Sequence, residues 1–470
     1  MKQVVWLREE FRLMDNQAIL EAFKHKAEDE KILLFFNLNP AQFLEGTYNH
    51  DYFFQALLKF IEYLKTEGIR MHLIVGTPLE AWQQLIATYP TIETVFLNEA
   101  TAGNGIKRDL EVTAMLEKFG IKVKACQDRH LCGPHAVLKK DGTPYRVFTP
   151  YYRQWQAQVK RPYTQNHSVK GEKHWEDNQT LSEKGDRLLK RIVDEKKYDM
   201  SHLVGYERAA DLLERFVHKV MPQYQETRDI PVLFGTSGLS PYIKTGEISI
   251  RQIWQVANDA PDSLGKETFL KELAWRDFYH MIDTWFPKQR QEELKEEYQT
   301  LAWRHDEKAF KQWQEGMTGY PIIDAGMRQL ATTGWMHNRL RMLTASFLTK
   351  DLLIDWRWGA RHFESYLLDY DPASNTGGWQ WAASTGTDAV PYFRIFNPTT
   401  QSERYDAKGT YIRRYVPELR HVPDAYIHEP AKMSRAEQQR YQCIIGEDYP
   451  APMVDHKEAR ERALDFFKQS

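Results

Sequence analysis

The stretch between Trp335 and Trp381 concentrates side chains that a helical core does not need. It contains Trp-Met-His-Asn-Arg-Leu-Arg-Met from Trp335, Asp-Tyr-Asp from Asp369, and Asn-Thr-Gly-Gly-Trp-Gln-Trp from Asn375. Arginine, asparagine, aspartate and tryptophan recur here at helical spacing beside two adjacent glycines. Because guanidinium groups bind anions and indoles offer flat faces, we interpret the stretch as the wall around a flat, partly anionic, aromatic ligand.

Two arginines in this stretch can serve different partners. Arg339 and Arg341 are two positions apart, so on a helix their side chains point in different directions. One can meet phosphates outside while the other meets an acidic or ligand group inside. Two solvated arginines are the simpler alternative. Asp371 followed by Pro372 predicts a helix N-cap with proline at the first position, which leaves ligand contact by Asp369 and Asp371 open.

The two tryptophans at the end of the stretch cannot serve the same surface. Trp379 and Trp381 are separated by two positions, which is about 200° around a helix. One should face inward and the other a cavity or solvent. Core packing explains either tryptophan alone. Their opposed positions behind Gly377 and Gly378 favour a site.

A second group of side chains shares one face of a helix predicted over residues 268–284. Its members occur at i, i+3, i+4 and i+7: Glu272, Trp275, Arg276 and Tyr279. The opposite side is apolar, with Leu270, Leu273, Phe278 and Met281. An exposed Glu272–Arg276 ion pair would stabilise the helix by only about 0.2–0.5 kcal/mol. An exposed tryptophan on the same face would instead indicate a binding surface, and both interpretations stay open.

Two further motifs give weaker signals. Residues 235–242 read Gly-Thr-Ser-Gly-Leu-Ser-Pro-Tyr, which suits donors around a phosphate but equally suits a turn that caps a helix. Residues 126–135 contain two cysteines and two histidines. Their spacing does not match Cys-x₂₋₄-Cys and no second pair lies nearby, so free cysteines are favoured over zinc.

Length and composition restrict the class of protein. A chain of 470 residues exceeds the usual size of a single core, so two or three domains are expected. The net charge of -2 provides no global field for nucleic acid, so any polyanion site must be a local patch. No apolar run reaches about 18 residues, no apolar signal region follows Met1, and the cysteines number three. These features predict a cytoplasmic protein without a disulfide framework.

Periodicity divides the chain into three parts. Residues 1–128 alternate buried strands (4–7, 32–36, 72–75 and 94–97) with helices that start near residues 16, 51, 78 and 106. This pattern predicts an α/β domain with a doubly wound, Rossmann-like parallel sheet, although Gly-x-Gly-x-x-Gly is absent after the first strand. Residues 129–202 read as a connector, with a solvated stretch over 166–182. Residues 203–470 predict a larger all-α domain, with helices over 206–220, 250–258, 268–284, 322–332, 338–348 and 361–368.

Taken together, five long motifs resemble the photolyase/cryptochrome flavoproteins, and most closely class I cyclobutane pyrimidine dimer (CPD) photolyases. They occupy residues 6–16, 235–240, 335–342, 375–388 and 391–398. The resemblance covers essentially the whole chain. It implies an N-terminal antenna domain, a connector, and a helical domain that holds FAD in a U shape. The site residues that it implies for FAD are Tyr224, Thr236, Ser237, Gly238, Leu239, Ser240, Asn338, Arg341, Asp369, Tyr370, Asp371 and Asn375.

The same resemblance implies roles around the cofactor. Asn375 would lie beside the flavin N5, and Arg341 would pair with Asp369 near the flavin ring. Light would drive an electron from reduced FAD to the dimer, and Glu272 would stabilise the dimer radical anion. Photo-oxidised flavin would be reduced through a chain of tryptophans: Trp379, Trp356 and Trp303.

The resemblance also implies UV-damaged DNA as the partner, bound by a monomer without an obligate protein partner and without a membrane. The flipped dimer would enter a pocket lined by Glu272, Trp275, Tyr279, Asn338, Met342 and Trp381. Damaged bases are the least costly to extrude, which supplies part of the selectivity. The residues that match positions near the DNA strand are Arg228, Arg276, Arg339, Arg394 and Gln401. Phosphate contacts there would fix the register of the DNA without reading its sequence.

Particular positions separate the members of this family. Asn338 and Met342 stand where (6-4) photolyases carry histidines, Asn375 stands where plant cryptochromes carry aspartate, and no long signalling tail follows Ser470. We therefore expect a deoxyribodipyrimidine photo-lyase, a carbon–carbon lyase. The alternatives are a cryptochrome-type blue-light photoreceptor that signals through a protein partner, and a flavoprotein that binds DNA without repairing it.

The antenna chromophore stays open at this point. Members of the family that bind methenyltetrahydrofolate carry glutamate in the loop before the Arg108-Asp109 pair, where this chain has Ala102. A folate antenna is thus not favoured, and another antenna or none remains an alternative. Glu99, which also belongs to this loop, is a candidate to substitute for the missing glutamate.

Overall fold

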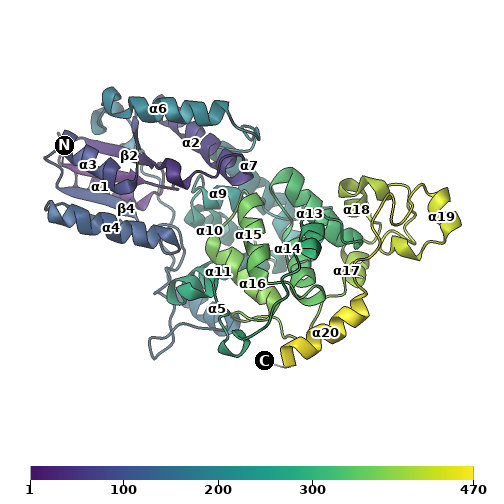
Figure 1. Cartoon of the computed structure of the whole chain (residues 1–470). Coiled ribbons are helices and arrows are strands. Elements are labelled where there is room, and N and C mark those ends of the chain that lie inside the picture. The colour runs from purple at the N-terminus through teal and green to yellow at the C-terminus, as the bar shows by residue number, and fades with distance from the viewer. Residues whose placement is uncertain (1, 469–470) are drawn as a thin grey trace.

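A computed structural model of the chain describes residues 2–468. Its N-terminal part is a parallel five-stranded sheet in the order β3-β2-β1-β4-β5 (Figure 1). The strands are β1 (Gln3–Leu7), β2 (Ile32–Leu38), β3 (Met71–Val75), β4 (Thr94–Asn98) and β5 (Lys122–Cys126). The four predicted strands are confirmed. The sequence analysis missed β5, a partly exposed edge strand in which lysines alternate with smaller side chains, so it lacks the apolar run of a buried strand.

Helices cover both faces of this sheet, as predicted for a doubly wound fold. Helices α1 (Gln17–His25), α2 (Tyr48–Thr66) and α6 (Gln179–Asp194) pack on the face that carries Val5 and Leu34. Helices α3 (Pro78–Thr88) and α4 (Asn104–Lys118) pack on the opposite face, against Val4 and Trp6. Successive strand residues point to opposite faces, so both faces of the sheet are apolar and buried.

Most of residues 166–182 are exposed or partly exposed, as predicted for a solvated stretch, but Val169, Trp175, Leu181 and Ser182 are buried and anchor it to the sheet domain. Val169 and Trp175 are fully or almost fully buried, and the hydroxyl of Ser182 accepts a hydrogen bond of 2.7 Å from the backbone N–H of Leu73 in β3. At Gly185 a Cβ atom would lie 2.2 Å from the carbonyl oxygen of Leu73, so only glycine permits this approach of α6. The polar composition hid these contacts because they join segments about a hundred residues apart in sequence. The domain boundaries themselves, 1–128, 129–202 and 203–470, stay a prediction.

The remainder of the described chain is helical, as predicted (Figure 1). Its helices are α5 (Phe148–Ala157) in the predicted connector, α7 (Tyr206–Arg215), α8 (Tyr224–Thr227), α9 (Ser240–Lys244), α10 (Ile250–Asp259), α11 (Leu264–Trp285), α12 (Glu307–Gln314), α13 (Pro321–Thr333), α14 (Asn338–Ser346), α15 (Trp356–Tyr366), α16 (Pro372–Ala383), α17 (Pro398–Tyr405), α18 (Thr410–Tyr415), α19 (Arg435–Arg440) and α20 (His456–Lys468). Among residues 2–468, none of these helices has the length and apolarity to cross a bilayer. Ser470 lies outside the described residues.

Two helices begin or end differently from the sequence prediction, for identifiable reasons. The helix predicted over residues 338–348 is α14 followed by a π-helical turn, Phe347–Asp351. The helix predicted over residues 361–368 is α15, which begins at Trp356 because the carboxylate of Asp355 caps the N–H of Arg357 at 2.8 Å. Its charged and aromatic first turn does not show the apolar periodicity that a sequence search recognises.

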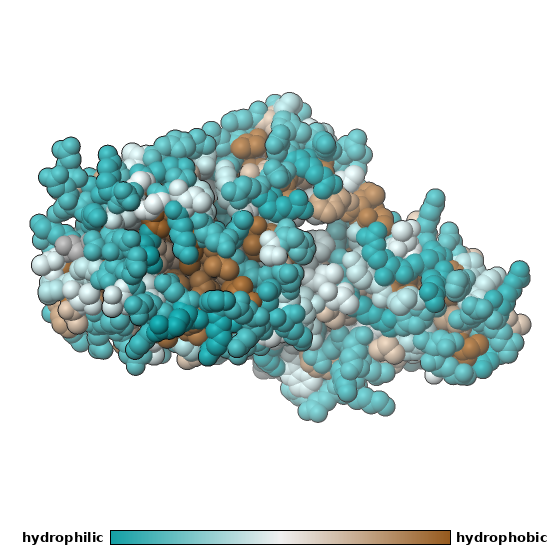
Figure 2. Space-filling model, turned by 90° about the horizontal axis from the view of Figure 1, so that it is seen from above, coloured by the Kyte–Doolittle hydropathy of each residue, from teal (hydrophilic) through white to brown (hydrophobic). Residues whose placement is uncertain are grey.

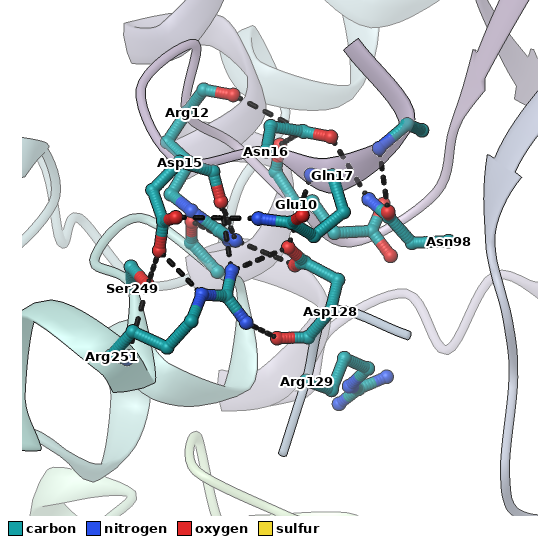
Figure 3. A network of polar contacts seen from close by, with 12 residues as sticks. Glu10, Arg12, Asp15, Asn16, Gln17, Asn98, Asp128, Arg129, Ser249 and Arg251 are labelled. Atoms are coloured by element: carbon teal, nitrogen blue, oxygen red, sulfur yellow. Dashed lines mark hydrogen bonds and ion pairs between the residues drawn. The ribbon is translucent and has the colours of Figure 1, made fainter. Parts of the chain in front are cut away.

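A buried charge network joins the α/β part to the helical part (Figure 3). Arg251 of α10 donates from Nε to Asp15 Oδ2 and from Nη2 to Asp128 Oδ1, each at 2.7 Å. Arg12 approaches the other oxygen of Asp128 at 2.5 Å. The Arg251 side chain is 2% exposed and both carboxylates are 1% exposed or less. Burial alone would raise the pKa of Asp128, but the two guanidinium groups hold it below its usual value.

Removal of this guanidinium should destabilise the protein strongly. Arg251→Met leaves Asp15 without its ionic partner in the interior, and breaking a buried ion pair typically costs about 3–5 kcal/mol. Arg187→Met on α6 is the matched control, since that side chain is 70% exposed and its partner Glu183 lies 3.8 Å away. The urea midpoint of unfolding should fall clearly for Arg251→Met and stay nearly unchanged for the control. Equal midpoints would contradict the stabilising role of the network.

Candidate functional site

One cavity of about 490 Å³ brings most of the predicted site residues together. Its walls come from α11, α14, α16 and the segment between α15 and α16. The predicted residues that line it are Arg228, Ser240, Glu272, Trp275, Arg276, Tyr279, Asn338, Arg341, Met342, Asp369, Tyr370, Asp371, Asn375, Trp379 and Trp381. The remaining lining residues are Ala345, Phe363, Leu367, Ser374 and Gly378. Segments separated by more than 100 residues in the sequence therefore form one wall.

The face of α11 points into this cavity, but its charges pair differently from the simplest expectation. Glu272 Oε1 accepts a hydrogen bond of 2.5 Å from Arg228 Nη1, whereas Arg276 Nη1 donates to the carbonyl oxygen of Arg129 at 2.7 Å. The alternative of a surface Glu272–Arg276 ion pair is wrong. Each residue is drawn to a partner outside the helix, so both remain at the cavity wall.

The ring of Trp275 is held by stacking. It lies parallel to Phe148 of α5, with ring centroids 3.8 Å apart and planes 7° apart. Tyr279 touches the same indole at 5.5 Å. Stacking over this area fixes the orientation of the Trp275 ring at the cavity. Sequence reasoning missed Phe148, because its partner lies more than 120 residues away and no local pattern links the two.

On α16 the two tryptophans differ in burial, as expected from their separation around the helix, but both border the cavity. Trp379 is 1% exposed and packs edge-on against Phe363 at 5.0 Å, with its inner end against Gly359. Trp381 is partly exposed, lines the cavity and lies 6.4 Å from Phe396. Asp371 caps the helix by accepting from the N–H of Ser374 at 2.8 Å, which confirms the predicted N-cap.

The two arginines of α14 also separate. Arg341 donates from Nη2 to both oxygens of Asp369, at 3.1 and 2.9 Å, which confirms the predicted pair. Arg339 instead reaches Asp229 at 2.8 Å and lies 4.5 Å above the ring of Tyr405. The same short segment thus presents one cation to the cavity and another to its outer rim.

Asp371 carries a stable negative charge at the floor of the cavity. His280 Nε2 lies 3.1 Å from Asp371 Oδ2, and Arg276 is close by. Burial alone would raise the pKa of Asp371, but the charges of His280 and Arg276 hold it well below its usual value. The floor of the cavity therefore combines an ionised carboxylate with a guanidinium.

The cavity fits the flavin dinucleotide that the resemblance implies. A Cβ atom at Gly378 would meet nothing within 4 Å, so the helix leaves open space there. The indole Nε1 of Trp379 is buried without a hydrogen-bond partner among the described residues. Asn375 Nδ2 donates to the carbonyl oxygen of Ala360 at 3.1 Å, which orients its amide at the wall. Polar groups and an open, partly apolar volume are what a large planar cofactor needs.

Some predicted residues do not line this cavity. Tyr224 and Leu239 are buried, and Thr236, Ser237 and Gly238 lie in the turn that leads into Ser240. Gly238 has a φ of 67°, a conformation that favours glycine. Arg339, Arg394 and Gln401 lie outside the lining, and Arg394 is exposed. The Oε1 atom of Gln401 is buried and lacks a hydrogen-bond partner among residues 2–468.

The three predicted electron-transfer tryptophans are all at most 7% exposed. Trp379 rests on Gly359, one helical turn after Trp356. The indole N–H groups of Trp356 and Trp303 both donate to Glu293 Oε1, at 3.2 and 2.9 Å. Sequence reasoning missed Glu293, which lies directly after Glu292 within a run of mainly charged and amide residues, 288–297, that reads as a solvated loop.

Two other cavities are separate from this site. One of about 230 Å³ lies at the carboxyl ends of β1 and β2, and its lining includes Trp6, Arg8, Phe36, His50, Arg108 and Lys244. The other, of about 540 Å³, includes Phe11, Phe60, Tyr63 and Tyr206 in its lining. Figure 2 shows apolar residues gathered in a hollow on the N-terminal half, framed by hydrophilic ones. No predicted site residue lines either cavity.

Cysteine and histidine side chains do not assemble elsewhere into a metal site. Cys126, Cys132 and Cys443 are free. Within residues 2–468 there is no group of three or more His, Cys, Asp and Glu side chains arranged to hold a metal ion.

Comparisons with known proteins agree with the geometry. A family model described as the FAD binding domain of DNA photolyase matches residues 269–469, and one described as DNA photolyase matches residues 3–169. A deoxyribodipyrimidine photo-lyase of Alkalihalophilus pseudofirmus is 49% identical over 99% of this chain and 98% of that protein. A class III photolyase of Agrobacterium tumefaciens has a TM-score of 0.89 at 34% identity, covering 100% of this chain and 98% of that one. A Sulfolobus tokodaii photolyase described with two FAD molecules has a TM-score of 0.83 at 29% identity, covering both chains fully.

Two adjacent glycines of α16 should respond oppositely to substitution. Gly377→Ala would place a Cβ atom 2.2 Å from the ring of Tyr279, and such overpacking costs about 1–3 kcal/mol. Gly378→Ala meets open space and should raise helix stability by up to about 1 kcal/mol. Thermal unfolding of the two variants without bound cofactor measures the difference, because a ligand in the cavity would occupy the space beside Gly378. Equal melting temperatures would contradict the packing of α16 against α11.

Proposed function

This chain belongs to the DNA photolyase family, and we propose that it is a deoxyribodipyrimidine photo-lyase that repairs cyclobutane pyrimidine dimers in DNA in the light. The observation that carries the proposal is the single cavity between α11, α14 and α16. Its lining contains both sets of side chains that the reaction needs, one suited to a flavin and one suited to a flipped pyrimidine dimer.

On the cofactor side, the chain binds FAD. When bound and reduced, FAD supplies the electron that light drives into the dimer. We assign Arg341 and Asp369 to the flavin ring, Asn375 to the ring nitrogen beside it, and the turn that ends at Ser240 to the phosphates. The pairing of Arg341 with Asp369 at 2.9 Å fixes the positions of both side chains at the cavity. The other residues assigned to the cofactor are Tyr224, Thr236, Ser237, Gly238, Leu239, Asn338, Tyr370 and Asp371.

On the substrate side, two tryptophans flank the dimer. Trp275 is fixed by Phe148, and Trp381 approaches from the opposite helix. Rings on two sides exclude water and offer apolar faces to the flipped pyrimidine dimer. Glu272 is assigned to hydrogen-bond the dimer, and Arg228 holds that carboxylate at the cavity wall. Tyr279, Asn338 and Met342 complete the pocket.

The DNA strand would meet a local basic rim. With a net charge of -2, the protein as a whole does not attract DNA. Arg228, Arg339 and Arg394 are assigned to phosphates, and Arg276 and Gln401 to positions near the strand. Phosphate contacts fix the position of the DNA strand on the protein and do not recognise its base sequence. This suits a lesion that occurs in any sequence context.

The proposal extends to the second chromophore and to the state of the protein. The cavity at the carboxyl ends of β1 and β2 is assigned to an antenna, because ligands of parallel sheets bind at that edge. The archaeal relative with two FAD molecules supports a second flavin-like occupant over a folate. We further propose that the protein works as a monomer in the cytoplasm without an obligate protein partner, which its free cysteines fit.

The activity itself is tested with purified, reduced protein and an oligothymidylate that contains cyclobutane dimers. Blue light should restore the absorbance of thymine, and darkness should not. If bound, reduced FAD is present and the absorbance stays constant in the light, the proposal fails.

Glu272→Ala should lower the quantum yield of repair and leave FAD bound. The lost hydrogen bond to the dimer, about 0.5–1.5 kcal/mol, predicts a roughly two- to tenfold decrease. Glu267→Ala, an exposed position of the same helix, is the matched control and should repair normally. An unchanged yield in Glu272→Ala would remove the assigned role.

Trp379→Phe should slow the photoreduction of oxidised flavin to near the background rate, because phenylalanine is much harder to oxidise than tryptophan. Repair by the chemically reduced protein should remain near normal. Trp82→Phe, a fully buried tryptophan of the α/β part, is the control. Rapid photoreduction in Trp379→Phe would count against the proposed electron path.

A further inference from the structure

Glu293 joins two tryptophans and one arginine in the interior. Its Oε1 atom accepts from the indole N–H groups of Trp303 at 2.9 Å and Trp356 at 3.2 Å. Arg357 donates to the same oxygen from Nη1 and Nη2, and to Oε2 from Nη2, each at 3.0 Å. The carboxylate is only 2% exposed. One buried carboxylate oxygen therefore accepts hydrogen bonds from both indoles.

Structural needs alone do not explain a carboxylate at this point. A buried indole N–H needs one acceptor, which is a backbone carbonyl for Trp313 (Thr344 at 3.0 Å) and Trp175 (Val169 at 2.7 Å). The indole of Trp155 donates to a carboxylate, Asp277 Oδ2 at 2.9 Å, but that carboxylate accepts from one indole, whereas Glu293 Oε1 accepts from two. Removing a carboxylate from water is costly, and only one cation compensates it here. An ionised acceptor shared by two indoles therefore indicates a chemical role.

We propose that Glu293 is the proton acceptor of the electron path: its carboxylate accepts the indole proton when Trp356 or Trp303 gives up an electron. The inference rests on the tryptophan path proposed above. The oxidant is the light-excited, oxidised flavin. It gains one electron by way of Trp379, and an outer indole loses one.

The protons and electrons of this step balance. The oxidised indole is a far stronger acid than the neutral indole, so its N–H bond breaks and the proton moves to Oε1 of Glu293. A neutral indolyl radical and a neutral glutamic acid result. Arg357 keeps a second carboxylate partner, Asp355, at 3.0 Å, so its charge stays compensated after the transfer.

The geometry favours this transfer over loss of the proton to water. Both donor–acceptor distances lie in the range in which a general base removes a proton, about 2.6–3.2 Å. Trp356 is 1% exposed and Trp303 7%, which keeps bulk water away from both indoles. In this low-dielectric interior the negative oxygen also stabilises the positive charge as it develops on either ring. Loss of the proton then traps the charge separation, because return of the electron requires return of the proton.

Glu293→Gln in the FAD-loaded, oxidised protein tests the proposal by transient absorption after a light pulse. The unaltered protein should show the cationic indole radical decaying to the neutral radical, with a slower decay in D₂O. In the variant we expect this deprotonation to slow roughly 10²-fold or more and the solvent isotope effect to disappear. Glu292→Gln, the exposed neighbouring glutamate, should behave as the unaltered protein.

A second measurement separates an effect of Glu293 on the environment of the indoles from an effect on proton transfer. In dark ¹⁵N spectra of tryptophan-labelled protein, Glu293→Gln should shift two indole N–H signals and leave that of Trp313 in place. Shifted signals with unchanged radical kinetics would reduce Glu293 to a structural role and overturn the proposal. If Glu293→Gln fails to bind FAD, Glu293→Asp replaces it. Aspartate keeps the charge but not the reach, so deprotonation should slow by a smaller factor, and an unchanged rate would again overturn the proposal.

The experiments distinguish an error in the role assigned to Glu293 from an error in the proposed tryptophan path on which that role rests. If Trp379→Phe photoreduces the flavin normally, the tryptophan path is wrong and Glu293 loses its role with it. If Trp379→Phe blocks photoreduction while Glu293→Gln leaves the radical kinetics unaltered, only the role of Glu293 is wrong.

Discussion

The guanidinium of Arg251, buried between Asp15 and Asp128, is the interaction on which the site depends. Both carboxylates belong to the N-terminal part, and the guanidinium comes from the helical part, so the network fixes how the two halves meet (Figure 3). Asp128 is followed directly by Arg129, whose carbonyl oxygen accepts from Arg276 at the cavity floor. Because the guanidinium groups lower the pKa of Asp128, its contribution to stability is present above the unfolded pKa and lost as the pH falls through the folded one.

Within the helical part, helical geometry directs residues that are close in sequence toward different partners. Residues two positions apart on α14 and α16 point in different directions, so Arg341 meets Asp369 while Arg339 meets Asp229. Trp379 is likewise buried against α15 while Trp381 is partly exposed, and both border the cavity. The proposed cofactor, substrate and electron path thus use separate faces of the same short helices. The use of separate helix faces explains why the stretch from Trp335 to Trp381 contains so many chemically distinct side chains.

The sequence predicted what local periodicity determines. The shared face of α11, the N-cap at Asp371 and the different burial of the α16 tryptophans follow from the period of the helix and from capping chemistry, and all three are confirmed. Contacts between distant segments could not be predicted in this way. Phe148 beneath Trp275 and the acceptor shared by two indoles arise only when separate elements pack, and the edge strand β5 has too few apolar residues to show a strand pattern.

A structure of the protein with bound FAD and a dimer-containing oligonucleotide would test the central claim most directly. The account predicts the flavin ring beside the Arg341–Asp369 pair and Asn375, and the flipped dimer between Trp275 and Trp381 within reach of Glu272. Both ligands should occupy the one cavity between α11, α14 and α16. A flavin bound elsewhere, or a dimer that stays outside this cavity, would contradict it.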